Sequence, residues 1–187
     1  MEILPGNHNK RTQKLELYLG VLVTVVLLLY QFRFIQSAGG LWRDEISSLT
    51  VATQPSLGEV WQSLPRHPIP LAPHLALRSW SFLFGSSMES LRIYGFLLGV
   101  SLVATLWFCS RLLGRTVPIL ALALLMLNPL TIQISASIRP FGLSIISSLL
   151  VLALVGRWLQ KPSWKIMFAT MLAAILSVQC SFQNAFI

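Results

Sequence analysis

The sequence predicts an all-α protein built as a multi-pass bundle of transmembrane helices, and two observations support this fold class. Apolar residues fill 55% of the 187 positions and charged residues only 11%, giving a mean hydropathy of +0.71. Because an ordinary soluble domain is about 25% charged, this chain has too few polar side chains to cover its own surface. The apolar residues also gather in runs of about 20, the helix length that spans the ~30 Å hydrocarbon core of a bilayer.

Five apolar segments are about long enough to cross the membrane as helices, the fourth only barely. They cover residues 15–35, 91–113, 117–134, 141–158 and 166–186. Residues 1–14 contain Lys10, Arg11 and Lys14, so the positive-inside rule predicts a cytoplasmic N-terminus in a plasma (inner) membrane protein. A cleaved signal peptide ending at Ser37-Ala38-Gly39 is the alternative, although its apolar core would be long for that role.

The segment 69–84, between the first two spans, is apolar but has a different character. It carries Pro70 and Pro73 in its first turn and Arg78 near its middle, a combination that makes a poor membrane span. The pattern instead predicts an amphipathic helix lying in the membrane interface. Its apolar face would be formed by Leu71, Leu75, Phe82 and Leu83. Residues 44–64 have a similar mixed character and predict a second in-plane helix.

The distribution of charges favours five spans over six. If the segment 69–84 stays outside, residues 36–90 form one outer loop and the loops at 111–115 and 157–165 face the cytoplasm. The basic residues of those two loops are Arg111, Arg115, Arg157, Lys161 and Lys165. The outer loop then holds the acids Asp44, Glu45, Glu59 and Glu89. This division satisfies the positive-inside rule, whereas a sixth span would place both basic loops outside.

Two kinds of site find no support in the sequence. The net charge of +8 comes from basic residues scattered between apolar runs, so we expect no nucleic-acid binding. Cys109 and Cys180 show no metal-ligand spacing, and the predicted topology places them near opposite ends of the bundle. We therefore interpret both as small apolar residues rather than as metal ligands or a disulfide.

Two adjacent acids in the outer loop are candidate catalytic residues. Asp44 and Glu45 lie about ten residues beyond the first span, where a carboxylate can accept a proton from a hydroxyl or bind a cation. Solvated surface charge is the simpler interpretation of such a pair. Because neighbouring side chains diverge by about 100° on a helix, we expect only one of them to act as the base, and we choose Asp44.

Three further residues are candidates for substrate binding. His67 precedes the segment 69–84, Arg92 closes the outer loop, and Arg139 lies before Pro140 at the outer end of the third span. Cations at the outer interface run against the positive-inside trend, and phosphate is a natural ligand for arginine. The simpler interpretations are lipid-headgroup contacts for the arginines and an ordinary loop position for His67.

Five short motifs stand in an order that resembles a known family. They are Trp42-Arg43-Asp44-Glu45, His67-Pro68-Ile69-Pro70-Leu71, Trp80 with Phe84-Gly85, Leu91-Arg92, and Arg139-Pro140-Phe141. From about Leu15 onward the chain resembles the GT-C superfamily of membrane glycosyltransferases. The likeness is greatest to the group of protein O-mannosyltransferases, aminoarabinose transferases and RgtA/B/C/D-like sugar transferases. The chain departs from that pattern at three places. Ser137 stands where relatives often have an acid, Phe141 replaces a tyrosine, and Val178-Gln179-Cys180-Ser181-Phe182 stands where relatives often have a Tyr-Thr-His stretch.

The resemblance implies a glycosyltransferase that moves a sugar from a polyprenyl-phosphate carrier to an acceptor on the outer face of the bilayer. Within it, Asp44 matches the acid that serves as base or metal-associated residue, and Glu45 matches the second acid of that motif. A divalent metal ion is left open as a cofactor. Family members are several hundred residues long, so we expect this chain to correspond to the N-terminal part of the membrane module, apparently truncated. The alternative is a non-catalytic membrane subunit or degenerate remnant that binds polyprenyl lipid or a partner protein.

Overall fold

The computed structural model describes residues 8–67, 69–128, 130, 134 and 137–186, and every regular element in that part of the chain is a helix. Their order is α1 (His8–Ser37), α2 (Arg43–Ala52), α3 (Leu57–Ser63), η1 (Leu64–Arg66), α4 (Leu71–Phe84), α5 (Met88–Leu112), α6 (Ile119–Leu127), α8 (Phe141–Gln160), α9 (Trp164–Cys180) and η2 (Phe182–Phe186). The all-α prediction is therefore confirmed.

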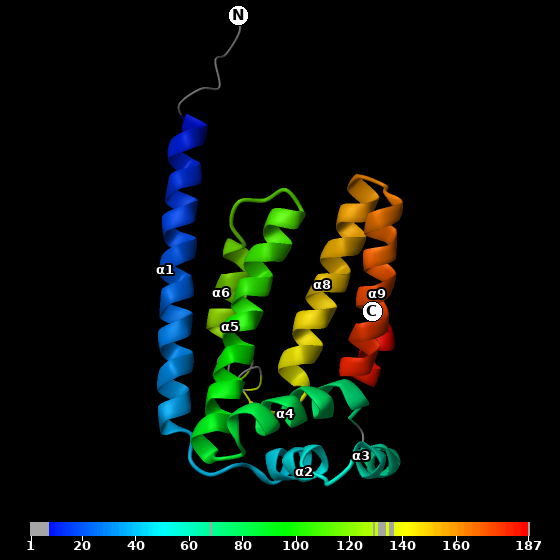
Figure 1. Ribbon diagram of the computed structural model, residues 1–187. Helices are drawn as coiled ribbons and strands as arrows, with labels where there is room; N and C mark the ends of the chain where they lie inside the picture. The colour runs from blue at the N-terminus through cyan, green and yellow to red at the C-terminus, as the bar shows by residue number, and fades with distance from the viewer. Residues whose placement is uncertain (1–7, 68, 129, 131–133, 135–136, 187) are drawn as a thin grey trace, which may run out of the picture.

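The helices form a bundle with a layer across one end. Figure 1 shows α1, α5, α6, α8 and α9 running side by side, while α2, α3 and α4 lie across the lower end of the bundle. The beginning of α1 and the α5–α6 and α8–α9 connections lie at the opposite end. Among the described residues, three helices are long and apolar enough to cross a membrane, namely α1 from Arg11 onward, α5 and α8. The apolar helix α9 is shorter, at 17 residues.

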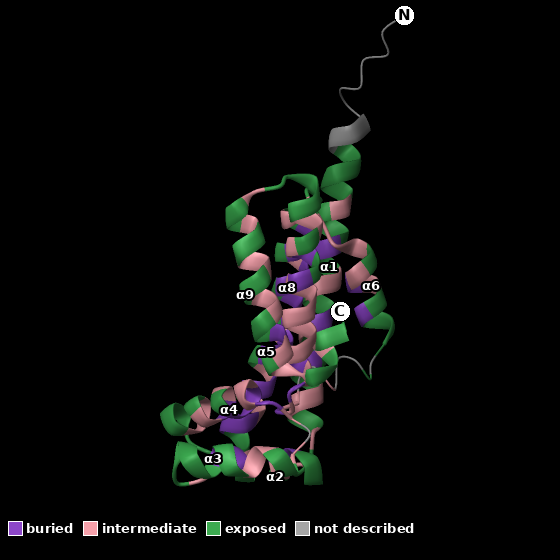
Figure 2. Cartoon of the chain, turned by 90° about the vertical axis from the view of Figure 1, so that its right-hand side faces the viewer, coloured by how far each residue is buried: buried purple, intermediate pink, exposed green. Residues whose placement is uncertain are grey.

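Helix α5 is the central helix of the packing, because it contributes residues to each of two hydrophobic cores. The first core joins α1, α5 and α6 through Leu27, Leu102, Val103, Leu106, Leu122 and Leu125. The second joins α5 to the layer of α2 and α4 through Ala52, Leu77, Leu91, Tyr94, Leu98 and Ile138. In Figure 2 the buried residues accordingly gather on α5 and on the inner surfaces of α2 and α4, while α9 and α3 are largely exposed.

The helix predicted over 69–84 is present as α4, and it lies across the ends of the long helices (Figure 1). It ends at Gly85, whose φ of 82° is a conformation that glycine adopts without steric cost. Its buried face carries Pro73, His74 and Leu77, so most of the apolar residues assigned to a lipid-facing surface remain exposed. The helix predicted over 44–64 is divided into α2 and α3, because Ser56 caps a new helix by accepting a hydrogen bond from the Glu59 amide.

Two predicted spans differ from the structure in length. The segment 117–134 was expected to be one helix, but α6 ends at Leu127 after nine residues, which is about 14 Å. The sequence at this point is Asn128-Pro129, and a residue that precedes proline is disfavoured in helical conformation. Most of the remaining segment, at 129, 131–133 and 135–136, lies outside the described residues. The last segment, 166–186, divides into α9 and η2.

Candidate functional site

A cavity of about 460 Å³ lies where the end of α1, the beginning of α2 and the segment before α8 meet. It is lined by Phe34, Ala38, Gly39, Trp42, Asp44, Glu45, Arg92, Leu130, Ile134, Ser137, Arg139 and Phe141. The described lining holds two carboxylates and two guanidinium groups, and the rest is mostly apolar or aromatic. Such a cavity can receive a molecule that is anionic at one end and apolar at the other.

Glu45 is buried at the wall of this cavity and joins three parts of the chain. One of its oxygens, Oε2, accepts a hydrogen bond of 3.1 Å from the amide of Trp42, which precedes α2. The other oxygen, Oε1, accepts one of 3.4 Å from the amide of Ile138. The guanidinium of Arg92 on α5 lies 3.9 Å from Oε2. The side chain therefore caps the beginning of α2 and fixes it against α5 and the segment before α8.

Arg92 completes the same network from the α5 side. Its Nη2 donates to the carbonyl oxygens of Gly39 and Gly40, at 2.7 and 3.1 Å, so the guanidinium also ties down the connection between α1 and α2. The exposed fractions of the Arg92 and Glu45 side chains are 12% and 3%. Removing one partner from a buried ion pair typically costs 3–5 kcal/mol, because the other charge is left uncompensated. The contacts of the Arg92 guanidinium are therefore mainly structural.

Asp44 and Arg139 form the second ion pair, and this pair is open to solvent. Their charged atoms, Oδ2 and Nη2, are 3.3 Å apart, and the side chains are 62% and 35% exposed. Exposed ion pairs contribute only about 0–1 kcal/mol, so this contact can open at little cost. The guanidinium of Arg139 also lies over the ring of Phe141, 4.7 Å from its centroid, and its buried Nε has no hydrogen-bond partner.

The structure thus brings together four of the five residues proposed from the sequence. Asp44, Glu45, Arg92 and Arg139 all line the cavity, although they come from distant parts of the chain. His67 is not among the described lining residues. It follows α3 and η1, and its ring faces that of His74 on α4 at a centroid distance of 6.3 Å.

Sequence reasoning did not find the structural role of Glu45 or the apolar wall of the cavity. A glutamate three residues after a helix-capping residue is a known signal, but the capping position here is Trp42 instead of serine or threonine, which hides the pattern. The wall residues Phe34, Leu130 and Ile134 sit within apolar runs, where nothing in the local sequence separates a cavity-lining residue from a lipid-facing one.

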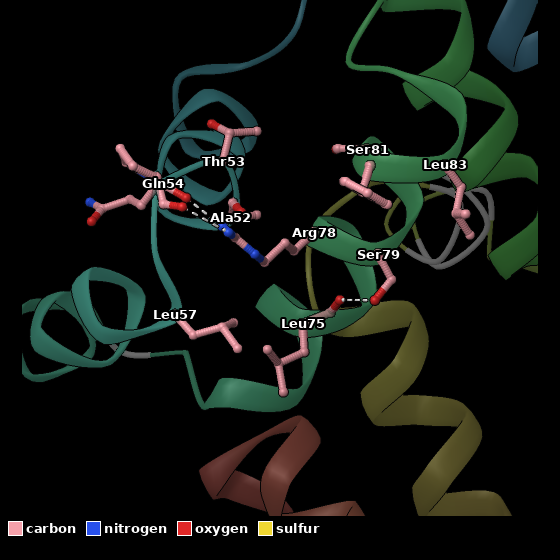
Figure 3. A pocket seen from close by; sticks show the side chains of 11 residues that line it. Ala52, Thr53, Gln54, Leu57, Leu75, Arg78, Ser79, Ser81 and Leu83 are labelled. Atoms are coloured by element: carbon pink, nitrogen blue, oxygen red, sulfur yellow. Dashed lines mark hydrogen bonds between the residues drawn. The ribbon is translucent and has the colours of Figure 1, made fainter.

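A second, larger cavity of about 790 Å³ lies between α2 and α4, and the arginine that lines it is already paired with backbone carbonyls, although the buried hydroxyl of Ser81 in the same lining has no hydrogen-bond partner. Figure 3 shows Arg78 reaching from α4 toward the end of α2. Its guanidinium donates to the carbonyl oxygens of Ala52, Gln54 and Pro55. Because the last carbonyls of a helix have no partner within the helix, Arg78 acts here as a cap for α2.

The donor set offers no ready metal site. No group of three or more histidine, cysteine, aspartate or glutamate side chains able to hold a metal ion occurs within the described residues. The cavity lined by Asp44, Glu45, Arg92 and Arg139 is called here the acid–arginine site. Each of its two carboxylates faces a guanidinium instead. We therefore assign no step of the chemistry to a metal ion.

Comparisons with protein families, with curated proteins and with solved structures give no match for this chain. The resemblance to the GT-C superfamily stays a prediction.

Proposed function

We propose that this chain is an integral membrane glycosyltransferase, or the N-terminal part of one, that transfers a sugar from a polyprenyl-phosphate carrier to an acceptor on the outer face of the membrane. One observation carries the proposal. Asp44 and Arg139 lie 3.3 Å apart on a partly apolar cavity, at one end of a bundle whose long helices are apolar enough to span a bilayer. A base and a phosphate-binding cation are the two groups that this transfer needs at the interface.

The two side chains have complementary tasks in the proposed reaction. The acceptor hydroxyl oxygen attacks the anomeric carbon of the donor sugar and gives its proton to the carboxylate of Asp44. The bond between that carbon and the phosphate oxygen breaks, and the bonding electrons leave with the phosphate. Arg139 binds the phosphate and stabilises its growing charge through charge-assisted hydrogen bonds. Because the Asp44–Arg139 pair is exposed and weak, a donor phosphate can replace the carboxylate beside the arginine.

The polyprenyl tail requires that the cavity open at the level of the membrane. We place α1, α5 and α8 across the bilayer and the layer of α2, α3 and α4 in the outer interface, in the inner membrane of the cell. The N-terminus and the α5–α6 and α8–α9 connections then face the cytoplasm. α5 and α8 begin at the same end of the bundle, so both would enter the membrane from the outer side. The positive-inside rule supports this orientation, because the basic loops gather at one end.

Reporter fusions test this orientation directly. A topology reporter placed after Gly85 should signal from the outer side, and one placed after Arg115 from the cytoplasm. A cytoplasmic signal at Gly85 would remove the proposed donor site from the outer face.

The function itself turns on Asp44. Asp44→Asn keeps the size and hydrogen bonding of the side chain but removes the proton acceptor, so transfer should fall by about 10²-fold or more. The measurement is sugar transfer from a polyprenyl-phosphate donor in membranes that contain the protein, expressed at its full length if it extends beyond this sequence. Expression and donor binding should stay near those of the unmodified protein, and wild-type transfer by the variant would refute the assignment.

Arg139 is tested by donor binding rather than by turnover. Arg139→Ala should weaken binding of the polyprenyl-phosphate sugar by roughly one to two decades, since a charge-assisted contact is worth about 1.5–3 kcal/mol. Arg66→Ala is the matched control, because Arg66 is an exposed arginine of the same outer layer and does not line the cavity. Equal losses from the two substitutions would mean that Arg139 contacts only lipid headgroups.

The second candidate is a non-catalytic membrane subunit or remnant that binds polyprenyl lipid or a partner protein. The observation that favours it is that both acids are already paired with arginines, Asp44 with Arg139 and Glu45 with Arg92. Donor binding that depends on Arg139, without any transfer that depends on Asp44, would select this alternative.

A further inference from the structure

A second charged cavity lies at the end of the bundle opposite to the acid–arginine site. It has a volume of about 620 Å³ and lies between α1 and the α5–α6 connection. Three cations line it, namely Lys14, Arg111 and Arg115, together with the apolar side chain of Leu17. We call this cavity the basic groove.

The cations of the basic groove have no protein partners within the described part of the chain. The two ion pairs found there join Glu45 to Arg92 and Asp44 to Arg139, both at the other end of the bundle. Lys14, Arg111 and Arg115 are exposed, and the described lining includes no acid. Glu16 on α1 is the nearest acid in sequence, and it is not part of that lining. Three like charges are thus held around one groove without compensation.

The backbone that carries Arg111 and Arg115 is held in a defined turn, which fixes the positions from which both side chains reach the groove. The amide of Arg115 donates to the carbonyl of Ser110 over 2.9 Å, and Gly114 between them has a φ of 79°. This is the Schellman arrangement at a helix end, which sets the direction in which the chain leaves α5. It places Arg111 and Arg115 on either side of one tight turn.

Helix α1 is held against the same region. The indole Nε1 of Trp107 on α5 donates to Oγ1 of Thr24 on α1, at 2.9 Å. One turn of α1 closer to the groove, Gly20 packs against Val117 so tightly that a Cβ atom at Gly20 would collide with it. The two walls of the basic groove therefore keep a constant separation.

We propose that the basic groove binds the headgroup of an anionic phospholipid in the cytoplasmic leaflet. Three uncompensated cations match one or two phosphate groups, and basic pockets at the cytoplasmic ends of membrane helices are suited to such headgroups. Leu17 is an exposed leucine of the same lining, and it gives the groove an apolar side that an acyl chain can cover. A free phosphate ion would leave that surface bare. The inference rests on the membrane orientation proposed above and not on the transfer reaction.

The test compares lipids and matched charge losses on the full chain in a neutral detergent. Native mass spectrometry counts the bound lipids during titration with phosphatidylglycerol or phosphatidylcholine. The unmodified protein should retain phosphatidylglycerol selectively. The double variant Arg111→Gln/Arg115→Gln should lose roughly 30-fold in affinity for it, at about fivefold for each charge removed.

Three controls keep the outcome decisive. Lys161→Gln/Lys165→Gln removes the same net charge from the α8–α9 connection and the first turn of α9, and it should change the affinity less than about threefold. A loss equal to that of the Arg111/Arg115 variant would mean that the lipid is held only by diffuse electrostatic attraction. Arg111→Lys/Arg115→Lys keeps the charges and should keep most of the binding, which separates the effect from misfolding. Inorganic phosphate at millimolar concentration should not displace the lipid, and displacement would identify a site for a free anion instead.

The result is independent of catalysis. Asp44→Asn should bind phosphatidylglycerol as the unmodified protein does, even though its sugar transfer is lost. Loss of transfer with intact lipid selectivity would leave the basic groove in place, and loss of selectivity alone would leave the proposed reaction untouched.

Discussion

Basic side chains at the two ends of the bundle differ in whether they have partners in the protein. At the end covered by α2, α3 and α4, the half-buried arginines Arg78, Arg92 and Arg139 contact carbonyl or carboxylate oxygens. Arg43 and Arg66 of the same layer are exposed. At the other end, the cations of the basic groove have no such partners among the described residues, and they are exposed.

Burial explains this difference. A layer of helices over a charged residue removes water from it, so the charge must find a partner in the protein. An uncovered cation keeps its water, or takes a ligand from outside. Charge alone therefore does not identify a binding residue in this chain. The informative residues are cations that remain unpaired, such as Arg111 and Arg115, or weakly paired, such as Arg139.

Removal of the Arg92 side chain should give the largest change in stability and is therefore the strongest test of this comparison. Arg92→Met should lower the free energy of unfolding by about 3–5 kcal/mol, because Glu45 would remain charged and buried. Arg115→Met at the uncovered end should change it by less than about 0.5 kcal/mol. Thermal unfolding in detergent measures both. Adding Glu45→Gln to Arg92→Met should restore part of the loss, and a fully additive double variant would show that the two side chains are not coupled.

Arg78 should give the next largest effect. Arg78→Met removes the donors for the last carbonyl of α2 and for two carbonyls that follow the helix, and we expect a loss of about 1–3 kcal/mol in the free energy of unfolding. The control is Arg66→Met in the same layer, since Arg66 is exposed and caps no helix. If both variants unfold at the temperature of the unmodified protein, the cap on α2 is not a stabilising contact.

The smallest expected effect concerns pH and the layer of α2 and α4. Burial lowers the pKa of His74 below its ordinary value of 6.5, nearby His67 lowers it further, and a backbone hydrogen bond at Ser48 raises it in part. The folded state then binds fewer protons than the unfolded state, so this contribution to stability is complete above pH 6.5 and declines as the pH falls below it. His74→Leu should flatten the dependence of the unfolding midpoint between pH 7.5 and 5. An unchanged slope in the variant would assign the dependence to other groups.

Local patterns predicted much of the fold. The lengths of the apolar runs indicated α1, α5 and α8, and the combination of Pro70, Pro73 and Arg78 indicated a helix that lies across the bundle. The prediction of one helix over 117–134 was wrong because Asn128-Pro129 interrupts an apolar run whose average hydropathy is still high. An average over the segment hides a single residue that cannot continue a helix.

The candidate site was predictable only in part. Divergence of neighbouring side chains indicated that Asp44 and Glu45 would face different surroundings, and in the structure Asp44 is exposed while Glu45 is buried. The reason for the burial of Glu45 lies in Arg92 and Ile138, which are distant in sequence. His67 was grouped with these residues because it precedes the segment 69–84, yet its ring is directed toward that of His74. Nothing local encodes that direction.

The hydrogen bond between Glu45 and Ile138 spans 93 positions of the chain, and this separation sets an order of events during biosynthesis. A ribosome completes α1, α2, α4 and α5 long before it reaches position 138. Until then the carboxylate of Glu45 has Arg92 and the Trp42 amide as partners, but one of its oxygens lacks the amide that later binds it. The link from α2 to the segment before α8, and the Arg139 side of the cavity, therefore form only after the start of α8 has left the exit tunnel and joined the earlier helices. A nascent chain that stalls before that point holds the acids without the arginine at 139, and so without the proposed phosphate-binding group.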